Sequence, residues 1–185
     1  MKILAITLVV AGALVAGHGL FIRAKAEVAQ ILLDRAWEET LTTGRPTKAW
    51  SWADTWPIAR ITFPRLHETA IVLADGGGEA LAFGPAHVAA SVEPGAQGTS
   101  VIAAHRDTHF SFIKDLKPGD LVELTTKTGR KLTYRMTGSA IVHAQASGIA
   151  PRGKTPRLAL VTCYPFDGVQ RGPLRYIVFA EAVKN

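Results

Sequence analysis

Cysteine is almost absent from this chain, because only Cys163 occurs among its 185 residues. A single cysteine excludes an internal disulfide bond. In an exported protein, where cysteines normally occur in pairs, an unpaired thiol indicates a reactive or intermolecular role. The alternative is that Cys163 is a small buried hydrophobic residue, as free cysteines often are.

The chain also lacks the sequence patterns of several ligand-binding classes. Its net charge is +6, but the basic residues are scattered, which favours a solvated basic surface over a nucleic-acid-binding stripe. No glycine-rich loop follows a strand and opens a helix, as a phosphate-binding loop would. His105 and His109 have the spacing of a metal-binding pair, but His105 follows a predicted strand and no third ligand is near. We therefore expect no metal and no cofactor.

A long apolar run, Ile3 to Ile22, is the first feature that the chain does have. It contains no charged residue apart from His18 and is long enough to span a bilayer as a helix. Ala24-Lys25-Ala26 could be the cleavage site of a signal peptide, but the length of the run favours an uncleaved signal anchor over residues 1–23. The flanking charges alone lean towards a cytoplasmic C-terminal part.

Residues 24–57 are expected to form a helical stalk followed by a wrapping segment. Apolar residues recur at helical spacing over residues 24–42, and Gly44 with the following Pro46 predicts the end of this amphipathic helix. Trp50, Trp52 and Trp56 then lie within seven positions. They could sit at a membrane interface, but packing onto the next domain is the favoured interpretation.

From residue 58 the pattern changes to short apolar runs and period-two alternation, which are typical of strands. Gly129 marks a hairpin turn before the alternating segment 131–137. Many short strands with few helices predict a mainly β fold over residues 58–185, a single antiparallel barrel or sandwich. The predicted strands are 58–63, 69–73, 79–83, 99–104, 121–125, 131–137, 139–144, 157–162 and 174–182.

Three chemically active side chains lie at the ends of predicted strands. His105 follows strand 99–104, Cys163 follows strand 157–162, and Arg175 lies at the start of the last strand, 174–182. A cysteine acts as a nucleophile only as a thiolate, so it needs a base or a cation nearby. Acyl transfer also needs a donor for the developing oxyanion. Side chains at strand ends can converge on one rim of a barrel, so these three form the candidate catalytic group.

The segments around these residues resemble three motifs of the sortase family. Ala159-Leu-Val-Thr-Cys163 resembles the Thr-Leu-x-Thr-Cys signature, Ala103-Ala-His-Arg-Asp-Thr-His-Phe110 resembles the segment around the catalytic histidine, and Gly172-Pro-Leu-Arg-Tyr-Ile-Val178 resembles the last strand with its arginine. The resemblance covers residues from about 58 to the end. Ala159 and Ala104 depart from the usual Thr and Gly. The N-terminal parts look most like sortases of Gram-negative, often marine, proteobacteria.

The resemblance implies a sortase-like β-barrel with short helices and a role for each residue of the group. Cys163 would attack a sorting signal to form a thioacyl enzyme, His105 would be the general acid and then the general base, and Arg175 would stabilise the oxyanion. Thr162 would support the thiolate or simply occupy a strand. Arg106 and Asp107 would support the site or form a local ion pair.

The implied enzyme is a membrane-anchored cysteine transpeptidase of the thiol-protease type. It would cleave a Leu-Pro-x-Thr-Gly-like C-terminal motif of an exported protein and join it to an unidentified amine. The resemblance puts the catalytic domain on the extracytoplasmic, periplasmic side of the inner membrane, against the lean of the flanking charges.

Two other functions stay open at this point. The same site could belong to a hydrolytic cysteine peptidase, or the chain could be a membrane-tethered peptide-binding β-domain with an inert thiol. Arg171 rivals Arg175 as the oxyanion residue, although a solvated charge is expected in its loop. His87, His109 and His143 are expected in turns or on the surface.

Overall fold

The computed structural model describes Gly12, Gly17 and residues 27–75, 77, 80–167 and 172–183. The predicted membrane anchor over residues 1–23 lies almost wholly outside these residues. Among the helices that the structure describes, none is both long and apolar enough to cross a bilayer.

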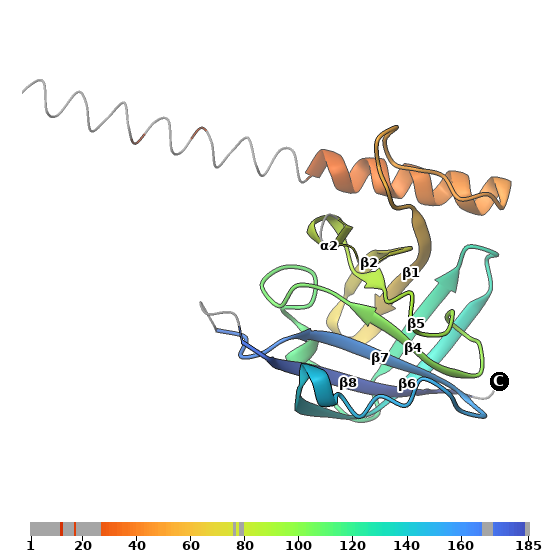
Figure 1. The fold of residues 1–185 in the computed structure, drawn as a ribbon. Coiled ribbons are helices and arrows are strands. Elements are labelled where there is room, and N and C mark those ends of the chain that lie inside the picture. Colours follow the sequence, from red (N-terminus) through yellow and green to blue (C-terminus); the bar gives the residue numbers. More distant parts are fainter. Residues whose placement is uncertain are drawn as a thin grey trace, which may run out of the picture.

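Eight strands close into one barrel in the order β1-β2-β3-β4-β7-β8-β6-β5 (Figure 1). The predicted mainly β barrel is therefore confirmed. Its strands are β1 (Pro57–Phe63), β2 (Glu68–Leu73), β3 (Ala86–His87), β4 (Gly98–Ala103), β5 (Leu121–Thr126), β6 (Lys131–His143), β7 (Pro156–Cys163) and β8 (Leu174–Ala182). The short helices are α2 (Ala80–Phe83) and the 3-10 turns Pro64–Leu66, Ile113–Asp115 and Ala144–Ala146.

Most neighbouring strands are antiparallel, but β2 with β3 and β4 with β7 are parallel pairs. Inside the barrel, side chains from alternate strand positions form the main core, including the fully buried Ile61, Leu124, Leu158 and Leu160. Alternation also leaves a second set of apolar residues on the outer face of β4, β7 and β8, namely Val101, Ala159 and Ile177.

Two predicted strands differ from the structure. The segment predicted as strand 79–83 is wrong, because residues 80–83 form the helix α2, whose Ala-Leu-Ala sequence has high intrinsic helix propensity. The strands predicted at 131–137 and 139–144 are one continuous strand, β6. Its register shifts between Met136 and Gly138, so the change of phase in the pattern marks a β-bulge and not a turn.

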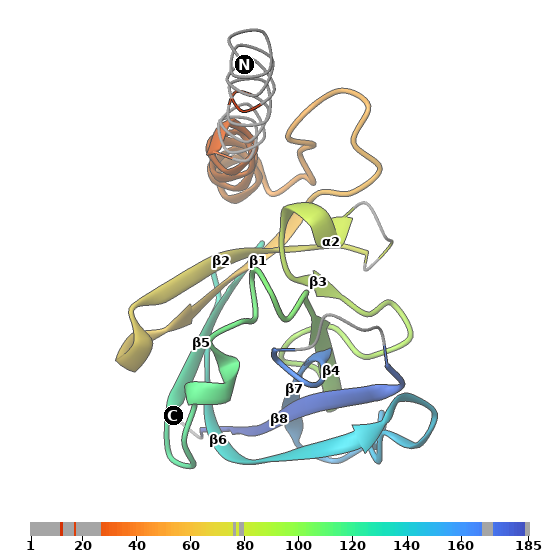
Figure 2. The ribbon, with the colours of Figure 1, turned by 90° about the vertical axis from the view of Figure 1, so that its left-hand side faces the viewer.

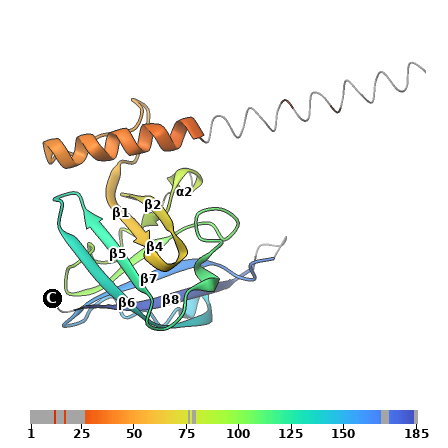
Figure 3. The same ribbon diagram turned by 180° about the vertical axis from the view of Figure 1, so that it is seen from behind.

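A helix over residues 27–43 lies across the β1–β2 side of the barrel (Figures 1 and 3). Its buried face carries Leu33 and Trp37, which pack with Ile71 and Leu73 of β2. Arg60 of β1 fixes it from the side through ion pairs to two of its acidic residues, Asp34 at 2.9 Å and Glu38 at 3.3 Å. The backbone N–H of Gly44, which has a φ of +67°, donates to the Thr40 carbonyl, so the predicted stop is confirmed.

The tryptophan-rich segment runs beside this helix and above α2 (Figure 2). Trp50 packs edge-on against Phe83 of α2 with ring centroids 4.7 Å apart, and Trp56 packs against the barrel core. Trp52, by contrast, is 82% exposed. The prediction of packing is thus confirmed for two of the three rings.

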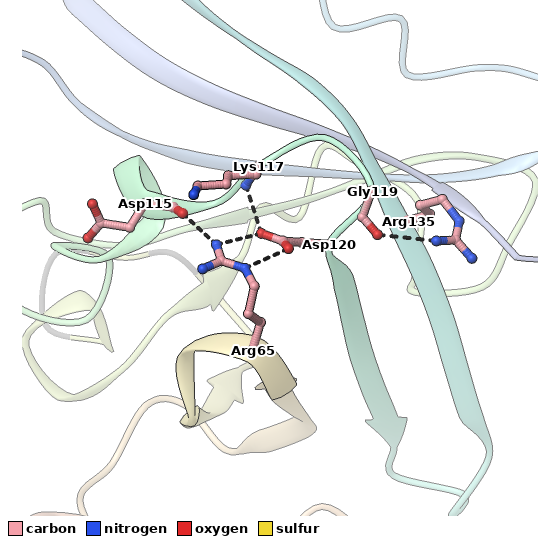
Figure 4. Close-up of polar contacts among 6 residues, drawn as sticks. All are labelled: Arg65, Asp115, Lys117, Gly119, Asp120 and Arg135. Carbon is pink, nitrogen blue, oxygen red and sulfur yellow. Dashed lines mark hydrogen bonds and ion pairs between the residues drawn. The ribbon is translucent and has the colours of Figure 1, made fainter.

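The half-buried carboxylate of Asp120 fixes the connection that leads into β5 (Figure 4). Arg65, in the turn between β1 and β2, makes a bidentate contact with Asp120, with both N–O distances 2.7 Å. Its Nη2 also donates to the carbonyl of Asp115 at 2.6 Å, and the backbone N–H of Lys117 donates to Asp120. This network holds the turn Ile113–Asp115 against the barrel.

Replacing Asp120 by Asn should lower the melting temperature by a few degrees at pH 7. The hydrogen bond from Arg65 holds the pKa of the Asp120 carboxyl below its usual value. A lowered pKa in the folded state adds stability above the unfolded pKa of about 4, and this stability is lost as the pH falls through the folded value. In thermal melts from pH 7 to pH 3, the difference in melting temperature between wild type and variant should therefore shrink below about pH 4.

Asp34→Asn is the matched control, because Asp34 also pairs with an arginine but its side chain is 60% exposed, against 10% for Asp120. Exposed pairs contribute little, so this variant should melt close to wild type. Equal losses in both variants would show that the Asp120 network has no special role.

Candidate active site

Cys163 and Arg175 face each other across an antiparallel pair of strands. Cys163 is the last residue of β7, Arg175 is the second residue of β8, and the two are direct partners in the register. Opposite residues of an antiparallel pair have Cα atoms about 4.5–5.5 Å apart and side chains on the same face. The thiol and the guanidinium therefore share one face at one end of the sheet.

His105 reaches the same level from the other side of β7. Strands β4 and β7 run parallel, with Ala103 opposite Val161. The pairing extends one residue further, because the N–H of Ala104 donates to the carbonyl of Val161 at 3.1 Å. Continuing in this register brings His105 level with Cys163. Cys163 thus lies between a histidine and an arginine on neighbouring strands.

The alternation of side chains puts all three residues on the outer face of the barrel. Leu158 and Leu160 of β7 point into the barrel core, whereas Ala159 belongs to the outer apolar cluster, so Cys163 continues the outer row. By the same alternation, Arg175 follows the row of Ile177. His105 points to the same face as Val101. Cys163 is half-buried, whereas His105 is exposed.

Thr162 ties the two parallel strands together beside this group. Its side chain is 2% exposed, and its hydroxyl donates to the carbonyl of Ala104 at 2.8 Å. Since Ala104 precedes His105 and Thr162 precedes Cys163, this bond fixes the two segments relative to each other. The structure thus gives Thr162 a buried structural contact rather than only a position in a strand.

Comparison with known proteins places this geometry in a family. The family model of the sortase domain matches residues 61–183, which include all eight strands except the first residues of β1. The chain belongs to the sortase family. Sortases are cysteine transpeptidases that recognise sorting motifs in their substrate proteins.

Individual relatives agree with this assignment. The chain is 29% identical over 124 residues to sortase D of Bacillus subtilis, a match that covers 66% of this chain and 62% of that protein. Sortase A of Corynebacterium diphtheriae has a similar structure, with a TM-score of 0.65 and 25% identity over 72% of this chain and 64% of that one. The sortase D5 transpeptidase of Clostridium perfringens shares the fold at a TM-score of 0.68 and 20% identity, over 85% and 99% of the two chains.

The segment after Cys163 packs back onto the mouth of the sortase barrel. The ring of Phe166 lies against Tyr176 of β8, with centroids 5.2 Å apart, and Lys114 lies 5.7 Å above the same ring. Lys114 belongs to the turn Ile113–Asp115 that the Asp120 network holds. Arg175 donates from one nitrogen, Nη1, to the carbonyls of Gly172 and Leu174 at 2.9 and 2.8 Å. These contacts fix the ring of Phe166 and orient the guanidinium of Arg175.

One histidine differs from its predicted place. His87 lies buried in β3, where its Nε2 bonds to the Val92 carbonyl and to Ser91, so its assignment to a turn or the surface is wrong. His109 lies in the turn that follows β4, as predicted, and is half-buried. His143 ends β6 and is exposed, as predicted.

The other supporting candidates lie close by in the chain. Arg106 is half-buried and Asp107 is exposed in the turn that follows β4. Their catalytic or ion-pairing roles stay predictions. Arg171, the rival oxyanion residue, lies outside the described residues.

Replacing Thr162 by Val should lower the free energy of unfolding by about 1–2 kcal/mol, because the buried Ala104 carbonyl loses its donor while the side-chain volume stays nearly constant. Urea unfolding followed by circular dichroism measures this. The control is Thr69→Val, whose hydroxyl is exposed on β2 and bonds only at 3.3 Å to Thr62. The control should stay within about 0.5 kcal/mol of wild type. A Thr162→Val protein as stable as wild type would refute the tie between β4 and β7.

Proposed function

We propose that this sortase is a membrane-anchored transpeptidase with Cys163 as nucleophile, His105 as acid and base, and Arg175 as oxyanion donor. The observation that supports the proposal is the strand register, which puts the three residues side by side at the ends of neighbouring strands, with Cys163 in the middle. The half-exposure of Cys163 also favours a reactive thiol over an inert one.

The first half-reaction forms a thioester. The thiolate of Cys163 attacks the carbonyl carbon of a residue in the sorting motif, so a C–S bond forms and negative charge moves to the carbonyl oxygen. Arg175 stabilises this oxyanion, since a guanidinium is permanently charged and donates in a fixed fork. The C–N bond then breaks, and protonated His105 gives its proton to the leaving amine.

The second half-reaction reverses the roles. His105, now neutral, takes a proton from the incoming amine as that amine attacks the thioester carbon. A new C–N bond forms, the C–S bond breaks, and the thiolate of Cys163 is regenerated. In hydrolysis, water takes the place of the amine, so the peptidase alternative uses the same residues.

Arg175 is suited to the oxyanion role because the protein uses only part of its hydrogen-bond donors. A guanidinium has five N–H donors, and the two bonds to backbone carbonyls both start from Nη1. Among the described residues no carboxylate lies within ion-pair distance of Arg175. These contacts orient the guanidinium, and Nε and Nη2 are the donors that the proposal assigns to the oxyanion.

The location of the enzyme is part of the proposal. The uncharged run Ile3–Ile22 supports an uncleaved anchor in the inner membrane, with the catalytic barrel on the periplasmic side. The substrate is an exported protein with a Leu-Pro-x-Thr-Gly-like motif near its C-terminus, and the acceptor is an amine. The likeness to proteobacterial sortases stays a prediction.

Incubating the full chain in mild detergent with a library of Leu-Pro-x-Thr-Gly-like peptides and an amine should give two products. Mass spectrometry should detect a thioacyl adduct on Cys163 and a peptide in which the amine has replaced the C-terminal part. Both should disappear in Cys163→Ala, because this variant lacks the nucleophile. The peptides that react would identify the motif.

The other outcomes separate the alternatives. An adduct that yields only hydrolysed peptide in the presence of several amines would favour the peptidase. Absence of an adduct with every peptide, together with a thiol that resists iodoacetamide in the folded protein, would favour the inert peptide-binding domain.

Arg175→Lys should lower kcat about a hundredfold or more, because one amino group cannot reproduce the paired donors at the oxyanion. Initial rates of amine exchange measure this. Arg135→Lys is the control, since Arg135 is exposed on β6 and bonds only to the Gly119 carbonyl at 3.2 Å (Figure 4). Equal rates for Arg175→Lys and wild type would exclude Arg175 from the oxyanion site.

A further inference from the structure

An open apolar groove lies between the helix over residues 27–43, the tryptophan-rich segment and α2 (Figures 1 and 2). It has a volume of about 520 Å³, and its walls include Val28 and Leu32 of the helix and the rings of Trp50 and Trp52. None of the three candidate catalytic residues lines it. The size is that of a ligand-binding cleft, and the lining suits an apolar group.

The rim of this groove is exposed apolar surface. Three of the four large hydrophobic side chains that are exposed among the described residues lie at or beside it. Trp52 is 82% exposed, and Val28 and Ile31 are 55% and 52% exposed. Val28 and Ile31 are neighbours on the helix surface, because they are three residues apart. Apolar surface that gathers in this way marks an interaction site, whereas single exposed side chains do not.

Trp52 is exposed but held in place. Its ring centroid lies 6.5 Å from that of Trp50, and Trp50 in turn packs edge-on against Phe83 of α2. A ring that is already positioned by its neighbours loses little conformational entropy when it binds. The packing therefore presents Trp52 outward in a form that is ready to bind.

The groove lies close in the chain to the proposed anchor. The uncharged run Ile3–Ile22 ends six residues before Val28, a path of at most about 22 Å even when fully extended. When this run spans the bilayer, the first turn of the helix is therefore held near the membrane surface. Tryptophan is enriched at that surface, where its ring lies among the lipid headgroups. The bilayer is thus an apolar partner that is always within reach of the groove.

The groove also lies toward the end of the barrel that carries the candidate active site. In Figures 1 and 3 the last turn of the helix and the end of β8 lie toward one end of the molecule. The first turn of the helix and α2 lie toward the other end, where β8 begins. Arg175 is the second residue of β8 and is paired with Cys163. Contact of the groove with the membrane would therefore bring the thiol's end of the barrel towards the bilayer.

We propose that this groove docks on the surface of the bilayer that holds the proposed anchor. Val28, Ile31 and Trp52 enter the headgroup region, and the groove receives the apolar part of a phospholipid. Asp54, the one charged residue among the described residues that line the groove, is exposed and stays hydrated at its edge. The barrel is then held in one orientation on the membrane. The inference rests on the anchor of the proposed function and not on its transpeptidase chemistry.

Tryptophan fluorescence of the full chain in phosphatidylcholine vesicles tests the contact. A share of the phosphatidylcholine carries a spin label near the headgroup, which quenches tryptophan emission only at short range. The emission of Trp52 is the difference between wild type and Trp52→Phe, and the label should quench it. The emission of Trp56, obtained in the same way from Trp56→Phe, is the internal control. It should not be quenched, because Trp56 packs against the barrel core.

Ile31→Glu should remove most of the quenching of Trp52, because a charge at the rim opposes transfer out of water. Ile141→Glu is the matched control, since Ile141 has a similar exposure of 49% but lies on β6, outside the groove. It should keep the quenching of wild type. Both variants change exposed side chains, so in detergent both should melt close to wild type and exchange amines on a soluble peptide at the wild-type rate.

The remaining outcomes separate the docking from the proposed function. Vesicles that float with the protein but do not quench Trp52, or equal quenching in Ile31→Glu and Ile141→Glu, would overturn the docking and leave the anchor in place. A protein that does not float with the vesicles would overturn the anchor and the docking together, while the thioacyl adduct still decides the chemistry. A dimer in detergent that Ile31→Glu dissociates, with no quenching in vesicles, would show that a second copy covers the groove instead.

Discussion

The parallel pairing of β4 with β7 is the constraint on which the site depends. Parallel neighbours end at the same edge of a sheet, so the residues that follow Ala103 and Val161 emerge side by side. An antiparallel pairing of the same two strands would send His105 and Cys163 to opposite ends of the barrel. The register then decides the face, since a slip of one residue would turn the thiol into the core. The hydrogen bond from the Thr162 hydroxyl to the Ala104 carbonyl joins the ends of the two strands and opposes such a slip.

The neighbouring strands and turns around this pair support the region of the candidate site. Arg175 is brought in by the antiparallel partner β8, and the Asp120 network holds the turn whose Lys114 covers Phe166. On the other side, the N–H of Phe110 donates to the carbonyl of His105 and closes the turn after β4. The residues between β4 and β5, which carry no long regular element, are therefore fixed from several directions. Loops can carry chemistry when a rigid scaffold positions them in this way.

The sequence was sufficient for the barrel, for most strand positions and for the three residues at strand ends. It was not sufficient for the parallel direction of β4 and β7, because alternation of side chains is the same in both directions. It also missed α2, since a four-residue apolar run bounded by glycine has no period long enough to distinguish helix from strand. His87 was misjudged for a related reason. Its burial comes from the place of β3 between β2 and β4, which pairing with distant strands decides and no pattern around His87 records.

The N-terminal helix connects these observations to the proposed anchor. Its buried face contributes Leu33 and Trp37 to a cluster with β2, and its ion pairs with Arg60 are exposed, so apolar packing rather than charge holds it on the barrel. Through Gln30 and Phe83 the same helix reaches α2. A helix that was only a spacer to a membrane would need none of these contacts. Its packing against α2 and β2 makes it part of the barrel's outer support, so the region that follows the proposed anchor is attached to the catalytic domain by one continuous set of contacts.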